Sequence, residues 1–299
     1  MVTKKNFSVS EYIFDIVNYT VLGVLALSCV VPFINIIAVS FSDSSSATAG
    51  RVGLWPVNFT PESYRLALAK PRFVTSMLNS LARVALGVAI NLAVTILTAY
   101  PLSKTKEAFK GRTFFSWFFV ITMLVGGGMI PTYLIVNWTG LRNSIWALVI
   151  PGALPIFNMV VLLNFFRQIP GELEESAMLD GAGDFRTLLQ IVLPLSVPCI
   201  ATLVIFMTIG HWNDWYSGMV YMDKIDKYPL ATYLHNVLQR PDFDRLSQMT
   251  PEERSRMLQI SPRTLQNAQI ALSTLPIICV YPFLQRYFVK GLTLGSLKG

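Results

Sequence analysis

Six long apolar segments follow one another along this chain, and the polar intervals between them hold most of its charged residues. The segments cover about residues 14–41, 74–101, 113–136, 143–166, 196–222 and 267–289. Each contains at least the ~20 residues that an α-helix needs to cross the hydrocarbon core of a bilayer. The pattern predicts an all-α, polytopic membrane protein with six transmembrane helices, built as a single transmembrane domain over residues 1–299.

The composition also favours a membrane protein over a soluble one. Of the 299 residues, 53% are hydrophobic and 14% are charged, whereas a soluble domain carries about 25% charged residues. The net charge of +7 suits a surface next to anionic lipid. It does not indicate nucleic-acid binding, because no basic patch is interleaved with aromatic residues.

The first apolar segment shares two features with a signal peptide, because Lys4 and Lys5 precede it and Ala47-Thr48-Ala49 imitates a cleavage site. Its apolar run is far longer than the about 7–15 residues of a signal-peptide core, so we expect a retained helix. The polar residues 42–50 that follow, SDSSSATAG, suggest an ordinary flexible loop.

The placement of Lys and Arg predicts the orientation. Their totals on the two sides of the membrane are nearly equal, but the short 102–112 interval is densely basic. Short basic loops stay in the cytoplasm, whereas long loops such as 42–73 and 223–266 cross regardless of charge. We therefore expect both termini and the 167–195 interval to be cytoplasmic.

Residues 170–194 predict a polar hairpin of two helices between two apolar segments. Pro170 suits the first turn of a helix, and Asp180-Gly181 marks its end, because Gly adopts the left-handed conformation found there. Asp184 suits the N-cap of a second helix, which Pro194 and Pro198 would end. The second helix would have one apolar face, made of Phe185, Leu188, Leu189 and Val192. A surface-lying amphipathic helix is the alternative, but it would carry more Lys and Arg.

Sequence motifs for catalysis are absent. The chain has no phosphate-binding G-x-x-x-x-G-K-[ST] loop, no H-E-x-x-H and no G-x-S-x-G. Any ATP that drives this protein would bind to another chain. The three cysteines, Cys29, Cys199 and Cys279, show no disulfide or metal spacing and suggest small buried apolar residues. We expect no cofactor and no metal site.

Polar residues within the apolar segments are the candidates for a transport path. Arg83 is expected to extend to the membrane interface. Asp214 lies in the run His211, Trp212, Asn213, Asp214, Trp215, Tyr216. That run suits an interfacial aromatic belt and, equally, a sugar site in which rings stack and polar groups bind hydroxyls. A gate or a helix contact is a third reading.

Glycines interrupt the third segment at Gly126-Gly127-Gly128, close to Tyr133. Such a break is tolerated in a membrane against other protein or a water-filled cavity, and close packing is the simpler explanation. Asn158 and Asn164 in the fourth segment would either bond across helices or line a path.

The hairpin also resembles the EAA loop of membrane subunits of binding-protein-dependent ABC importers. That pattern runs Glu-Ala-Ala, two residues, Asp-Gly-Ala, five residues, Phe, two residues, Ile, one residue, Leu-Pro. The matching positions are Glu175-Ser176-Ala177, Asp180-Gly181-Ala182, Leu188, Ile191 and Leu193-Pro194. Ser176 replaces an Ala and Leu188 replaces the Phe, and both keep small or apolar character.

Further segments resemble the smaller membrane subunit of carbohydrate importers of the maltose-transport type. These are residues 285–299 at the C-terminus and 99–103 before the basic loop. Residues 126–133 and 146–152 are similar to the subgroup that handles complex oligosaccharides.

The resemblance implies an ATP-driven importer of the bacterial cytoplasmic (inner) membrane that works by alternating access. A second, related membrane subunit would complete the pore, two ATPase subunits would bind ATP and Mg, and an external binding protein would deliver the sugar. A helix at 171–186 would couple to the ATPase, through Glu174, Glu175, Ser176, Ala177, Met178, Leu179, Asp180, Gly181, Ala182 and Gly183. The tail 287–299 would contact it through Lys290, Gly291, Gly295 and Ser296. The substrate path or gate would include Tyr133, Asn158, His211, Trp212, Asn213, Asp214 and Trp215.

Two other function classes compete with this reading. An ion-driven secondary transporter would show several embedded carboxylates and inverted repeats, and a membrane-embedded transferase or hydrolase would show a carboxylate pair or metal cluster. The substrate itself is not evident. Arginines in the last outer loop favour an acidic oligosaccharide, but interleaved acidic residues favour a self-paired helix: Arg240, Arg245, Arg254, Arg256 and Arg263, against Asp242, Asp244, Glu252 and Glu253.

Overall fold

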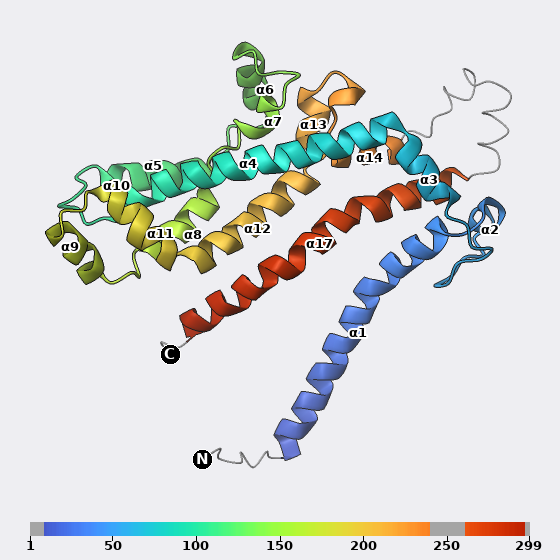
Figure 1. The fold of residues 1–299 in the computed structure, drawn as a ribbon, viewed down its shortest axis with the longest axis horizontal. Helices are drawn as coiled ribbons and strands as arrows, with labels where there is room; N and C mark the ends of the chain where they lie inside the picture. Colours follow the sequence, from blue (N-terminus) through green and yellow to red (C-terminus); the bar gives the residue numbers. More distant parts are fainter. Residues whose placement is uncertain (1–8, 240–260, 297–299) are drawn as a thin grey trace. The chain divides into compact units, whose positions relative to one another are not determined.

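A computed structural model describes residues 9–239 and 261–296, and for residues 280–296 it describes the backbone alone. The regular elements in these ranges are all helical (Figure 1). The chain divides into two compact units, residues 1–70 with 237–274, and residues 71–236 with 275–299. The acidic and basic residues between Arg240 and Glu253 that bear on an acidic substrate lie outside the described residues, as do Arg254 and Arg256.

The first unit contains three helices from the N-terminal part of the chain and the beginning of the last helix. They are α1 (Val9–Ser40), α2 (Ser44–Thr48), α3 (Glu62–Ala69) and the start of α17 (Pro262–Ser296). The prediction of a flexible loop after α1 is wrong, because the helix α2 forms within residues 42–50. Asp43 caps α2 by accepting from the backbone N–H of Ser46 at 3.2 Å, and Arg263 donates to the Ala47 carbonyl at 3.1 Å.

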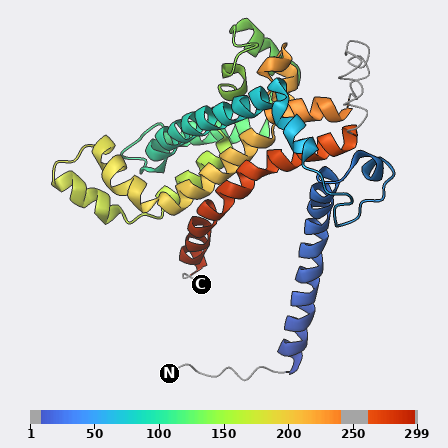
Figure 2. The same cartoon turned by 45° about the vertical axis from the view of Figure 1, so that its right-hand side comes forward.

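The second unit is built around one long helix, α4 (Pro71–Ser103), which packs against α8 (Ile156–Phe166) and α12 (Val197–Asn213). These three helices lie side by side in both views (Figures 1 and 2). Their contact is an apolar core, which includes Ala99, Leu102, Met159, Leu162, Leu203 and Met207.

Apart from the last part of α17, the remaining elements of this unit are short. They are α5 (Arg112–Leu124), α6 (Met129–Trp138), α7 (Trp146–Val149), α9 (Gly171–Leu179), α10 (Asp184–Thr187), a π-helical turn (Leu188–Val192), α11 (Leu193–Leu195), α13 (Tyr216–Tyr221), a 3-10 turn (Ile225–Lys227) and α14 (Leu230–Gln239), whose last residues belong to the first unit.

Two of the described helices, Tyr12–Ser40 and Pro71–Ser103, are long and apolar enough to cross a membrane. The number rises to four if α5 with α6, and Asp184–Leu195 with α12, each form one bent span. The fourth apolar segment holds two short helices, because Pro151, Gly152 and Pro155 separate α7 from α8. Six spans therefore stay a prediction from the sequence.

The break in the third apolar segment is confirmed. The axes of α5 and α6 differ by 113°, and Gly128 between them has a φ of +82°. A Cβ atom at Gly126, Gly127 or Gly128 would meet nothing within 4 Å. Within this chain no packing contact requires these glycines, whereas the positive φ of Gly128 favours a glycine there.

The predicted end of the first hairpin helix is also confirmed. Gly181 has a φ of +79° and its N–H donates to the Met178 carbonyl at 3.0 Å, while the Ala182 N–H donates to the Ala177 carbonyl at 2.9 Å. These two bonds form a Schellman motif, which satisfies the last carbonyls of α9. The hairpin lies at the end of the unit where α4 finishes (Figure 1).

The second hairpin helix differs from the prediction. Gly183, not Asp184, occupies its N-cap position, and Pro194 lies inside α11 instead of ending a helix. The preceding π-helical turn accommodates this proline, which has no N–H to offer to the residue four positions earlier. Leu188 and Val192 are buried, whereas Phe185 and Leu189 are exposed, so the single apolar face is wrong.

The last helix continues past the predicted end of the sixth segment. The backbone of α17 stays helical to Ser296, so Lys290, Gly291, Gly295 and Ser296 lie on its last turns. Two of the cysteines expected to be buried, Cys29 and Cys279, are exposed in the isolated chain.

Candidate functional site

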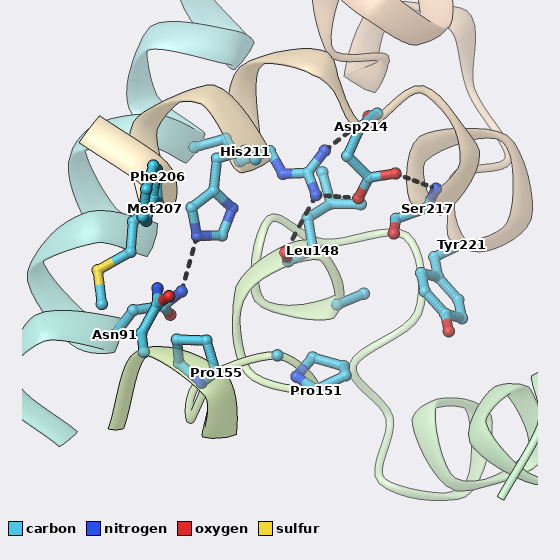
Figure 3. Close-up of a pocket in the computed structure, with 15 residues that line it drawn as sticks. Asn91, Leu148, Pro151, Pro155, Phe206, Met207, His211, Asp214, Ser217 and Tyr221 are labelled. Carbon is cyan, nitrogen blue, oxygen red and sulfur yellow. Dashed lines mark hydrogen bonds and ion pairs between the residues drawn. The ribbon is translucent and has the colours of Figure 1, made fainter. Parts of the chain in front are cut away.

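A cavity of about 400 Å³ opens within the second unit, between α4, α8, α12, α13 and the segment that joins α7 to α8. Figure 3 shows that polar and apolar side chains alternate around it. The polar ones include Asn91, His211, Asp214 and Ser217, and the apolar or aromatic ones include Pro155, Phe206 and Tyr221. The volume lies within the range of about 300–1,000 Å³ that small-molecule pockets occupy.

Arg83 is buried at the edge of this cavity and is paired there. Its guanidinium forms an ion pair with Asp214, donates to the Asp214 carbonyl at 2.9 Å and donates to the Leu148 carbonyl at 3.4 Å. The expectation that Arg83 extends to the membrane interface is therefore wrong. A buried guanidinium needs a counterion and acceptors, and both come from segments far away in the sequence.

Asp214 holds a bend as well as the ion pair. Its Oδ1 accepts from the backbone N–H of Ser217 at 3.0 Å, which caps α13 directly after the end of α12. Through Asp214 and Leu148, Arg83 joins α4 to the end of α7 and to the α12–α13 bend. One ion pair thus holds these three segments together beside the cavity.

His211 faces α4 at close range. The Asn91 amide and His211 Nε2 lie 3.1 Å apart, and an amide N–H that donates there makes Nε2 the acceptor. A Cβ at Gly87 would collide with the imidazole ring. Gly87 therefore admits His211 to its position, one helical turn before Asn91.

The cavity is close to neutral. Arg83 is the one Lys or Arg among its lining residues that the structure describes, and Asp214 compensates its charge. Amide, imidazole and hydroxyl groups lie beside proline and aromatic surfaces. Such a lining suits contacts with hydroxyl groups and ring faces of a bound molecule, and its one Arg side chain is already paired with Asp214. The described residues contain no cluster of three His, Cys, Asp or Glu residues that could hold a metal.

The structure brings together only part of the predicted path. Asn158, His211 and Asp214 line the cavity, whereas Tyr133, Trp212, Asn213 and Trp215 do not. Trp212 is buried elsewhere, and the Trp215 ring stacks on His235 at 3.8 Å between ring centroids. Tyr133 stacks on Tyr221 at 6.5 Å, and Asn164 is exposed. The two tryptophans therefore do not provide a stacking surface inside this cavity.

Sequence reasoning missed the contribution of α4. Its buried positions include a polar stripe at helical spacing, made of Ser76, Ser80, Arg83, Gly87, Asn91 and Thr95. Small and polar residues at every third or fourth position of an apolar helix mark a face that packs on protein, not on lipid. That periodicity was present in the sequence and would have identified Asn91.

The hairpin helix α9 is the second candidate site. Ala177 is buried, whereas Glu175, Ser176 and Asp180 are exposed. The tip presents apolar side chains to the outside, and Leu179 is 90% exposed beside the exposed Met178. An apolar, rigidly capped tip of this kind is typical of a docking surface.

Glu174 attaches the inner face of α9 to the end of α4. It forms an ion pair with Lys104, whose Nζ lies 4.1 Å from the centroid of the Tyr100 ring. Desolvation lowers the pKa of Lys104, but its hydrogen bonds and charge interactions with Glu174 and Tyr100 outweigh this and raise it overall. Lys104 therefore stays charged at neutral pH.

Several known proteins match this chain along most of its length. LplC of Bacillus subtilis (strain 168) is 38% identical over 292 residues, which cover 96% of this chain and 95% of that protein. The polygalacturonan/rhamnogalacturonan transport system permease protein YtcP of the same organism is 37% identical, with coverage of 96% and 99%. The trehalose/maltose transport system permease protein MalG of Thermococcus litoralis is 29% identical, with coverage of 92% and 94%.

Solved structures extend the likeness to three dimensions. A chain in the crystal structure of a bacterial ABC transporter involved in the import of the acidic polysaccharide alginate superposes with a TM-score of 0.85. It is 33% identical, and the match covers 94% of this chain and 99% of that one. The profile of a family described as "Binding-protein-dependent transport system inner membrane component" matches residues 111–294, more than half of the chain. This chain therefore belongs to the family of inner membrane components of binding-protein-dependent transport systems.

Proposed function

We propose that this chain is the permease subunit of an ATP-driven importer that moves an oligosaccharide across the bacterial cytoplasmic membrane. The observation that carries the proposal is the match along nearly the whole chain to a subunit of an alginate importer, with a TM-score of 0.85 at 33% identity. Relatives named for polygalacturonan, trehalose or maltose transport support a sugar as the substrate. The chain itself would catalyse no reaction.

An acidic oligosaccharide is the substrate class that we favour. The support comes from the names of two similar proteins, a polygalacturonan/rhamnogalacturonan permease and an alginate importer. The cavity would contribute contacts to ring faces and hydroxyl groups through Asn158, His211 and Asn91. Arg83 would not bind a substrate carboxylate, because Asp214 already neutralises it.

The remaining parts of the machine would be other chains. A second, related permease would complete the pore, two ATPase subunits would bind ATP and Mg, and an external binding protein would deliver the sugar. Residues 174–183 would dock on one ATPase, and Lys290, Gly291, Gly295 and Ser296 would reach it from α17. The exposed apolar tip of α9 supports the docking role. Both termini would lie in the cytoplasm. ATP-driven closure of the two ATPase subunits would switch the pore from inward-facing to outward-facing.

Purification of the tagged chain from native membranes in mild detergent tests this proposal. We expect a second permease and an ATPase to accompany it, and ATP hydrolysis to rise when binding protein loaded with galacturonate oligosaccharides is added. Maltodextrins of equal length serve as the neutral control. A chain that purifies alone and supports sugar uptake driven by an ion gradient, without ATP, would contradict the proposal in favour of a secondary transporter.

A further inference from the structure

Three side chains from two separate parts of the second unit meet where the hairpin contacts the membrane helices. Glu174 comes from α9, Tyr100 from the last turn of α4, and Lys104 directly follows α4. The Lys104 and Glu174 side chains are 13% and 20% exposed. The exposed pair Arg65–Glu62 is 78% and 44% exposed. The Lys104–Glu174 pair is therefore shielded from water. An ion pair and a cation–π contact are stronger in such a desolvated environment than in water.

Tyr100 extends this contact to the core. Its ring meets the ring of Phe166 edge-on, at 6.3 Å between centroids and 84° between planes. Arg167, the residue after α8, donates to the Leu102 carbonyl of α4 at 3.2 Å. The ends of α4 and α8 are thus joined to each other, and Lys104 joins α9 to both.

The chain connections of α9 do not provide the same link. The helix follows residues 167–170 on one side and is followed by the Gly181–Gly183 turn on the other. Seventy positions separate Lys104 from Glu174, so α9 reaches α4 by contact alone. Within α9, Ala177 is buried and Glu174 forms the polar contact with Lys104, the residue that follows α4.

The helix α4, at whose end Tyr100 lies, also lines the cavity. Arg83, Gly87 and Asn91 lie on one face of α4, about three to five turns before Tyr100. We propose that Lys104 is a positioning residue that couples α9 to α4 through Glu174, so that a displacement of α9 moves the helix that lines the cavity. This inference rests on the proposed role of α9 as the helix that docks on the ATPase.

The test uses the complete importer in proteoliposomes, with sugar uptake and ATP hydrolysis measured together. In Lys104→Met we expect the ATPase to stay bound, while the sugar transported per ATP hydrolysed falls by about fivefold to tenfold. The charge-swapped double variant Lys104→Glu/Glu174→Lys restores most of the ratio. Lys106→Met, an exposed lysine on the same loop, is the matched control and leaves the ratio unchanged.

A further variant separates failure of this inference from failure of the proposed function. Leu179→Asp places a charge on the exposed tip and is expected to release the ATPase. If Leu179→Asp keeps a coupled ATPase, the docking role of α9 is wrong and the inference falls with it. If Leu179→Asp releases the ATPase but Lys104→Met keeps the parental ratio, the inference alone is wrong. Loss of the ATPase from Lys104→Met, or no recovery in the charge swap, would also overturn it, because Lys104 would then only hold the local fold.

Discussion

Removal of the charge of Asp214 should destabilise this protein far more than the same change at Asp223. Both carboxylates pair with an arginine of a different segment. The Arg83 and Asp214 side chains are 3% and 27% exposed, whereas those of Arg142 and Asp223 are 40% and 47% exposed. The two sites thus allow an Arg–Asp ion pair to be compared between a largely buried and an exposed environment.

The magnitude follows from what Asp214→Asn leaves behind. The amide oxygen can still accept from Ser217, so the cap of α13 is kept, but the buried guanidinium of Arg83 loses its counterion. Breaking a buried pair in this way costs about 3–5 kcal/mol, and we expect about 3 kcal/mol because Asp214 is partly exposed. Asp223→Asn removes an exposed pair, worth at most about 1 kcal/mol.

Unfolding of the detergent-purified protein, followed by tryptophan fluorescence against temperature or denaturant, measures both changes. The double variant Arg83→Met/Asp214→Asn adds a coupling test, since the second substitution removes the stranded charge. We expect it to be more stable than Asp214→Asn alone. Equal losses for Asp214→Asn and Asp223→Asn, or additive losses in the double variant, would refute the reasoning.

Three further predictions concern other parts of the structure. Gly87→Ala should cost about 1–3 kcal/mol, because its Cβ meets the His211 ring, and His211→Ala in the same chain should recover most of that loss in thermal unfolding. Gly181→Pro should abolish sugar uptake while membrane insertion stays normal, because proline requires a φ near about −65° and Gly181 has +79°. The control Gly171→Ala, whose Cβ would lie in open space, should keep uptake in the same assay. Normal uptake by Gly181→Pro would count against the hairpin assignment. Hydrogen bonds from Ser45 and Ser46 hold the pKa of Asp43 well below its usual value. The Asp43 carboxylate therefore stabilises α2 fully above about pH 4, and this stabilisation declines as the pH falls further. Hydrogen exchange of the α2 amides should show that decline in the parent protein but not in Asp43→Asn.

Local features of this fold were predictable from the sequence, and contacts between distant segments were not. The turn at Gly181 and the break at Gly128 follow from the conformational freedom of glycine, which acts within a few residues. The pairing of Arg83 with Asp214 spans 131 positions. Nothing in either local sequence specifies that partner, so the general rule that Arg reaches for the interface gave the wrong answer.

Two other errors have identifiable physical causes. The fourth apolar segment has enough hydrophobic residues for one helix, yet Pro151, Gly152 and Pro155 divide it, and hydropathy alone does not register proline. A strict helical period predicts one apolar face for the second hairpin helix. The π-helical turn before Pro194 changes the rotation between successive residues, so only Leu188 and Val192 of that face are buried.

Sugar uptake by the purified importer in proteoliposomes is the most direct test of the central claim. The vesicles would contain this chain, its co-purified permease and ATPase, and external binding protein with labelled galacturonate oligosaccharide. The account predicts uptake that requires ATP and Mg on the ATPase side, requires the binding protein, and is insensitive to ionophores. Uptake that persists without ATP and stops when an ion gradient is dissipated would contradict it.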